Sequence, residues 1–88
     1  MPFAKKFGIK QADDPLLPQR RVQVGAFEDI QFEVAVAYSA SADTFVAHPY
    51  VVTSAGEKTK VGAEPLHAAD ERLAFTRGWA VIDHWLSK

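Results

Sequence analysis

Cysteine is absent from this 88-residue sequence, which excludes a disulfide framework, a thiolate metal site and a cysteine nucleophile. Neither sign of charge dominates, since ten Lys and Arg stand against eleven Asp and Glu. The electrostatic signature of a dedicated nucleic-acid or acidic-membrane binder is therefore missing. No run approaches the roughly 18 apolar residues of a membrane span, and the first ten residues lack the apolar core of a secretory signal. These absences predict a cytoplasmic protein.

The composition is that of an ordinary globular domain, with 48% hydrophobic and 24% charged residues. A chain of this length forms one domain at most and is near the lower limit of what a single core stabilises, so burial in a second subunit would help it. We expect residues 1–19 to form a loose arm, because lysines surround their few apolar residues and Asp13, Asp14, Pro15 and Pro18 end any regular element. A short edge strand at 7–10 is the alternative. Residues 20–88 should form the domain.

Alternation of apolar and polar residues predicts strands from residue 20 onward. Residues 20–27 alternate, with Gly25 permitting a bulge, and residues 30–38 alternate most regularly. Glu28 and Asp29 should form the turn between them. Residues 45–53 are rich in β-branched and aromatic residues, and residues 59–61 could add a fourth short strand. Pro49 cannot donate to a ladder, which predicts that one side of the third strand is unpaired there.

The C-terminal run from Pro65 to Lys88 predicts one amphipathic helix. Its apolar arc contains Ala74, Phe75, Gly78, Trp79, Val81, Ile82, Trp85 and Leu86. Proline suits the first helical position, so the helix should begin near Pro65. Glycine within a helix costs about 1 kcal/mol relative to alanine, so Gly78 should lie where another backbone approaches closely.

Together these elements predict a two-layer α+β fold. Strands joined by short loops pair as antiparallel neighbours, which gives a meander of three to four strands with the helix on one face. The heavier row of the second strand should meet the helix; it comprises Phe32, Val34, Val36 and Tyr38. Their expected contacts on the helix are Phe75, Gly78, Ile82 and Trp85.

The other face of the sheet is the predicted interaction surface. If odd positions of neighbouring strands lie together, the face is shallow and partly apolar, with a candidate protein interface at Ala35, Ala37, Ala47, Pro49 and Val51. An antiparallel sheet can leave such a face in water. The alternative is that it binds a second copy or another protein, since twofold dimers are the commonest oligomers. The sequence thus favours a small non-catalytic protein-interaction domain, with a homodimer as one form of it.

No pattern of catalytic or ligand-binding residues supports an enzyme. The three histidines lack the spacing of a zinc site, His67 and His84 being about 25 Å apart along one helix at 1.5 Å per residue. There is no G-x-S-x-G motif and no glycine-rich phosphate loop. We therefore expect no catalytic residues, no metal and no cofactor, and rank an enzyme third among the functions.

The second-ranked function is nucleic-acid binding. Its candidate contacts are Arg20, Arg21, Lys58 and Lys60, which a meander could bring near one edge, with Tyr50 or a tryptophan for stacking. Solvated strand ends are the simpler interpretation of these four residues.

Strands followed by a helix resemble, in topology, double-stranded-RNA-binding modules and HicB-like antitoxins. The lysine cluster typical of the RNA-binding family is here replaced by Glu64-Pro65-Leu66-His67. The chain also resembles small uncharacterised bacterial proteins in which a strand meander precedes a helix with the pattern A-x-x-x-G-x-x-x-x-x-x-W, here Ala74, Gly78 and Trp85. That resemblance implies a fold and no activity.

Overall fold

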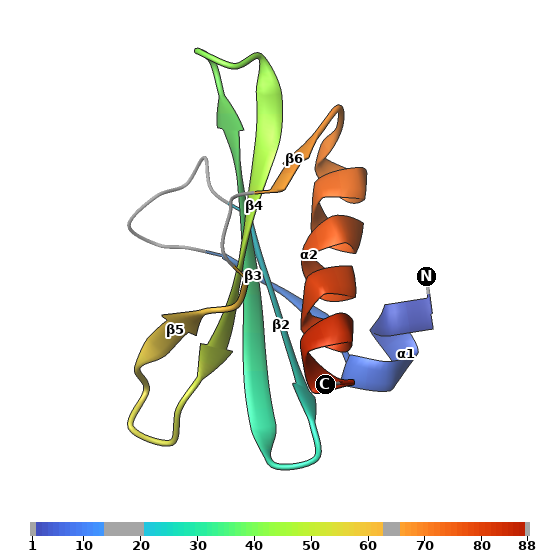
Figure 1. The fold of residues 1–88 in the computed structure, drawn as a ribbon, viewed down its shortest axis with the longest axis vertical. Coiled ribbons are helices and arrows are strands. Elements are labelled where there is room, and N and C mark those ends of the chain that lie inside the picture. The colour runs from blue at the N-terminus through green and yellow to red at the C-terminus, as the bar shows by residue number, and fades with distance from the viewer. Residues whose placement is uncertain (1, 14–20, 63–65, 88) are drawn as a thin grey trace.

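The structure, a computed structural model, describes residues 2–13, 21–62 and 66–87, without the side chains of Pro2 and Asp13. In chain order the elements are α1 (Pro2–Phe7), β1 (Lys10–Asp13), β2 (Arg21–Phe27), β3 (Ile30–Ser39), β4 (Thr44–Val52), β5 (Lys58–Lys60), β6 (Leu66–Ala68) and α2 (Glu71–Leu86). Both helices lie on one side of the sheet (Figure 1). The predicted two-layer α+β fold is confirmed.

The sheet is an antiparallel meander in the order β1-β2-β3-β4-β5, and β6 also pairs with β4. The predicted strands β2, β3 and β4 begin and end within one residue of the expected positions. Glu28 and Asp29 form the β2–β3 turn, in which Glu28 has a left-handed φ of 55°. Within the described residues the sheet has six strands instead of three or four, because β1 and β6 lie in segments where the sequence predicted an arm and a helix.

The prediction of a loose N-terminal arm is wrong for residues 2–13; residues 14–19 lie outside the described part of the chain. Phe7 of α1 is 2% exposed and its ring stacks on Trp79, with centroids 5.1 Å apart. Edge contacts join the same ring to Phe27 and Phe32 at 6.1 and 5.9 Å. Burial of one aromatic side chain thus holds α1 against the core, which local composition does not reveal.

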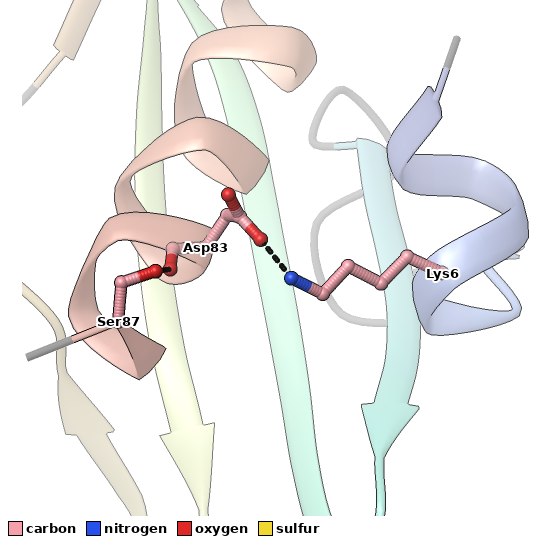
Figure 2. A network of polar contacts seen from close by, with 3 residues as sticks. All are labelled: Lys6, Asp83 and Ser87. Carbon is pink, nitrogen blue, oxygen red and sulfur yellow. Dashed lines mark hydrogen bonds and ion pairs between the residues drawn. The ribbon is translucent and has the colours of Figure 1, made fainter.

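An ion pair adds to this contact between the helices. Figure 2 shows Lys6 extending from α1 to the carboxylate of Asp83 on α2. The backbone carbonyl of Asp83 accepts a hydrogen bond from Ser87 Oγ at 3.1 Å in the last turn of α2. Both side chains of the ion pair are about one-third exposed or more, so its contribution to stability is small beside that of Phe7.

The helix begins six residues later than the position predicted at Pro65, which itself lies outside the described residues. Asp70 is the N-cap, and its carboxylate accepts the backbone N–H of Leu73 at 2.7 Å. Leu66–Ala68 instead form β6 and pair with the stretch Phe45–Ala47 of β4. Pairing with a free strand edge and a good N-cap together outweigh the helical pattern before residue 70.

The packing of α2 on the sheet follows the predicted apolar arc. Its buried residues are Ala74, Phe75, Gly78, Trp79 and Ile82. The four with side chains share one core cluster with Phe32, Val34 and Val36 of β3. Trp85 is 39% exposed and reaches Phe32 edge-on at a centroid distance of 5.9 Å. Tyr38 is 53% exposed and packs on Phe45, so its expected place under the helix is wrong.

Two glycines allow the layers to approach. A Cβ at Gly78 would lie 2.5 Å from Cγ1 of Val34, so the predicted close contact exists but is made by a side chain instead of a backbone. Gly25 keeps a continuous register opposite Phe32 and makes no bulge. A Cβ there would lie 2.9 Å from the Phe7 carbonyl oxygen and 2.9 Å from the Trp79 ring. Both positions exclude any larger residue without movement of the core.

Candidate interaction surface on the helix-free face

The pairing of β3 with β4 does not bring the five predicted interface residues onto one face. Residues directly opposite each other in an antiparallel pair share a face. Ala35 and Ala37 lie opposite His48 and Val46 on the helix-free face. The other three predicted residues, Ala47, Pro49 and Val51, lie opposite Val36, Val34 and Phe32 and therefore face the helix.

The reason is the register of the β3–β4 hairpin. Ser39 pairs with Thr44 across a four-residue connection, so odd positions of β3 meet even positions of β4. Ala35 and Ala47 are 0% exposed, and Pro49 is also fully buried. The predicted interface is therefore divided between a buried core face and the opposite surface.

Pro49 does mark an interruption in the pairing of β4, as the sequence predicts. On the side of β4 away from β3, β6 pairs with residues 45–47 and β5 pairs with residues 50–52. Pro49 lies between these two partners, and its carbonyl accepts the N–H of Val61 at 2.9 Å. Proline's missing donor is thus accommodated where the ladder changes partner.

The predicted nucleic-acid contacts are not brought together either. Arg20 lies outside the described residues. Arg21 lies on the helix side of β2, where its Nε is 3.2 Å from Oε1 of Glu71. Lys58 and Lys60 are on β5, which β3 and β4 separate from β2.

The register instead forms two rows of residues that cross the helix-free face, the first with a lysine at each end and the second with a lysine at its β5 end. One row consists of Lys10, Val24, Glu33, Tyr50 and Lys60, on strands β1 to β5 in order. The adjacent row consists of Ala26, Gln31, Val52 and Lys58. We call these nine residues the lysine-flanked surface. Val24, Tyr50 and Val52 are half-buried in its middle.

Seven residues of this surface line a pocket of about 470 Å³, together with Phe7, Gly8, Gly25 and Phe32; the seven are Lys10, Val24, Ala26, Gln31, Glu33, Val52 and Lys58. Glu33 is the buried charged residue of the pocket, with 9% of its surface exposed. Its Oε2 is 2.8 Å from the Lys58 ammonium and accepts no hydrogen bond of normal geometry from the described residues. Burial of a carboxylate is costly unless it is paired, so the Lys58 ammonium is needed at this position.

The lysine-flanked surface is positively charged although the chain as a whole carries −1. It contains three lysines and one glutamate, an excess of two positive charges. In the part of the chain that the structure describes, neither Lys10 nor Lys60 has an ion-pair partner. The surface therefore favours groups of negative charge.

Sequence reasoning named Lys58, Lys60 and Tyr50 but missed Lys10 and Val24. These two join the surface through strand pairing, and β1 begins at Lys10, where the alternative strand at 7–10 was expected to end. Phe7 and Ile9, whose alternation suggested that strand, precede β1, and Phe7 lies in α1.

Comparison of the chain with protein-family models, with curated proteins and with solved structures finds no significant match. Among residues 2–13, 21–62 and 66–87, no three side chains of His, Asp or Glu form a group able to hold a metal ion. In the same ranges, neither helix has the length and hydrophobicity that a bilayer span requires.

Proposed function

We propose that the protein is a non-catalytic interaction domain whose lysine-flanked surface binds an acidic segment of another protein. The observation that carries this proposal is the arrangement of the surface itself. Half-buried Val24, Tyr50 and Val52 occupy its middle, and lysines occupy both edges. Protein interfaces have the same organisation, with an apolar and aromatic centre inside a polar rim.

Charge selects the kind of partner. The backbone positions of Lys10 and Lys60 lie at opposite edges of the sheet, about four strand spacings or roughly 19 Å apart at 4.8 Å per strand. A segment crossing the strands with acidic residues near its ends would meet both lysines, with apolar residues over Tyr50 between them. Complementary charge of this kind raises association rates and selects partners.

A second copy of the chain fits this surface less well than an acidic partner. A twofold dimer places the same patch on both sides of the interface, so lysines would oppose lysines. We therefore favour a different protein over the homodimer, which remains the other form of the interaction hypothesis.

A peptide-display library panned against the protein tests the proposal. Enriched peptides should combine Asp or Glu with apolar residues. Tyr50→Glu and Lys60→Glu should each abolish their binding because both place a carboxylate on the surface. Arg72→Glu is the matched control for Lys60→Glu, since it replaces a cation by a carboxylate on the exposed side of α2 and should leave binding intact.

Absence of acidic sequences among the enriched peptides, or equal loss with Arg72→Glu, would contradict the proposal. Sedimentation of the wild-type protein at micromolar concentration supplies the second arm. A dimer that Tyr50→Glu dissociates would assign the surface to a second copy instead.

Nucleic acid is the second candidate, and one pairing favours it. Tyr50 lies directly opposite Lys60, which places a ring suited to base stacking beside an ammonium suited to a phosphate. Fluorescence anisotropy with labelled single- and double-stranded RNA at two salt concentrations tests this alternative. Binding that weakens steeply with salt and disappears in Tyr50→Ala would support it, whereas no binding at low salt would exclude it.

A further inference from the structure

The pocket beneath the lysine-flanked surface has features beyond those on which the proposed function rests. Lys10 and Lys58 reach it from opposite edge strands, β1 and β5, and the side chains of Val24 and Val52 form apolar walls between them. Its volume of about 470 Å³ lies within the range of small-ligand sites. The pocket therefore combines two cationic groups with apolar side chains.

The ammonium of Lys58 is held in place inside this pocket. Glu33 is anchored in the middle of the sheet, and its buried Oε2 lies 2.8 Å from Lys58 Nζ. An ammonium has three N–H donors, so Lys58 can keep Glu33 and still donate to a second acceptor. A fixed donor loses less conformational freedom on binding than a free lysine does.

Lys10 supplies the charge that the pocket leaves uncompensated. Glu33 neutralises Lys58, whereas the Lys10 ammonium has no carboxylate partner among the described residues. One further negative charge between Lys10 and Lys58 would make the pocket neutral. The complementary ligand is a monoanion with two or more acceptor oxygens and a short aliphatic stem.

We infer that this pocket binds a carboxylate on a short aliphatic chain, between Lys10 and Lys58, with its methylene groups against Val24 and Val52. The inference rests on the proposed function, because the group assigned to the pocket is a glutamate side chain of the acidic partner. The same chemistry could come from a free aliphatic acid, and the test separates the two sources.

The test is an NMR titration of the ¹⁵N-labelled full chain with N-acetyl-glutamate α-amide, and with the neutral glutamine analogue as the matched probe. The charged probe should shift the amide signals of Val24, Ala26 and Val52 saturably, in the millimolar range expected for so small a ligand. The neutral probe should bind at least about tenfold more weakly, since it lacks the charge-assisted hydrogen bonds.

Variants identify the lysine that recognises the carboxylate. Lys10→Met should weaken the charged probe about tenfold, the loss expected for one hydrogen bond to a charged group. It is preferable to a change at Lys58, which would leave the buried Glu33 without its cation and could unfold the chain. Arg72→Met, an equivalent change on α2, should leave the affinity within about twofold of wild type.

Equal binding of the charged and neutral probes, or unchanged affinity in Lys10→Met, would overturn the inference. Hexanoate is the third probe. If it binds more tightly than the glutamate probe with the same dependence on Lys10, the carboxylate is that of a free aliphatic acid, and the assignment to a side chain is wrong.

Failure of the inference is distinguishable from failure of the proposed function. Acidic peptides that bind wild type and lose binding in Lys60→Glu, together with no saturable shift by the glutamate probe, would contradict the pocket inference and leave the proposed function intact. Binding of the glutamate probe without any enrichment of acidic peptides would contradict the proposed function alone.

Discussion

Substitution of Gly78 by alanine tests the contact between the two layers. A Cβ at this position would lie 2.5 Å from Cγ1 and 3.3 Å from Cγ2 of Val34, whereas carbon atoms in contact are optimally about 3.5–4.0 Å apart. Relief requires a movement of about 1 Å by one layer. Val34 is 0% exposed and β-branched, so its side chain cannot turn away freely.

Two opposing effects determine the size of the change. Alanine improves helix propensity by about 1 kcal/mol, and overpacking of a core typically costs about 1–3 kcal/mol. We expect Gly78→Ala to reduce the free energy of unfolding by about 1 kcal/mol, which for a domain of this size lowers Tm by about 4–8 °C. Gly78→Leu should be several times more destabilising.

A double-mutant cycle with Val34→Ala separates this explanation from a general effect on the helix. Val34→Ala removes two methyl groups, which costs about 2 kcal/mol of stability in wild type. The same substitution should cost less when residue 78 is alanine, because it also removes the clash with the new Cβ. Urea unfolding of the four proteins measures the coupling, which should be about 1 kcal/mol. A rise in Tm for Gly78→Ala alone, or additivity within about 0.5 kcal/mol, would refute the reasoning.

Three further predictions test other contacts. Phe7→Ala should lower the free energy of unfolding, measured by urea unfolding, by about 3–5 kcal/mol. A loss below about 1 kcal/mol would show that α1 does not pack against the core. Ile82→Ala should cost about 2–5 kcal/mol and His84→Ala less than about 0.5 kcal/mol, and a reversed order would mean that α2 presents another face. Asp43 accepts the Tyr38 hydroxyl hydrogen bond, which, with some desolvation, raises the pKa of Tyr38 above 10.0. The stability that this hydrogen bond contributes is present below pH about 10 and is lost as pH rises through the raised pKa. Asp43→Asn should lower the Tyr38 pKa, measured in a phenolate absorbance titration. An unchanged Tyr38 pKa would contradict the hydrogen bond.

The strands β2, β3 and β4 could be predicted from the sequence because their patterns are local. Each alternates because one face is buried against the helices, and a period of two is difficult to produce in another way. The buried positions of α2 were predictable for the same reason: its five buried residues all belong to the expected apolar arc. At the end of the helix the arc extends past the core, so Trp85 remains partly exposed.

The short elements α1 and β6 could not be predicted because tertiary contacts stabilise them. The helix α1 has six residues and β6 has three. An isolated helix of that length is unstable in water, and it forms here because Phe7 inserts against Trp79. Similarly, Leu66–Ala68 have a pattern compatible with the helix that follows, and only the free edge of β4 makes them a strand.

Prediction of the candidate surface required the register between β3 and β4. Alternation of apolar and polar residues alone does not determine that register. A shift of one residue in that register would exchange the faces of every side chain on β4, and Pro49 and Val51 would then join Ala35 on the helix-free side. In the observed register Pro49 and Val51 face the helix. Ala35 is on the helix-free side but is 0% exposed, so a charge at Ala35 would test folding instead of association. Tyr50→Glu is the informative substitution, since Tyr50 is half-buried between Glu33 and Lys60 on the surface itself. Its carboxylate can reach solvent, so loss of binding with retained folding would locate the interaction on this face.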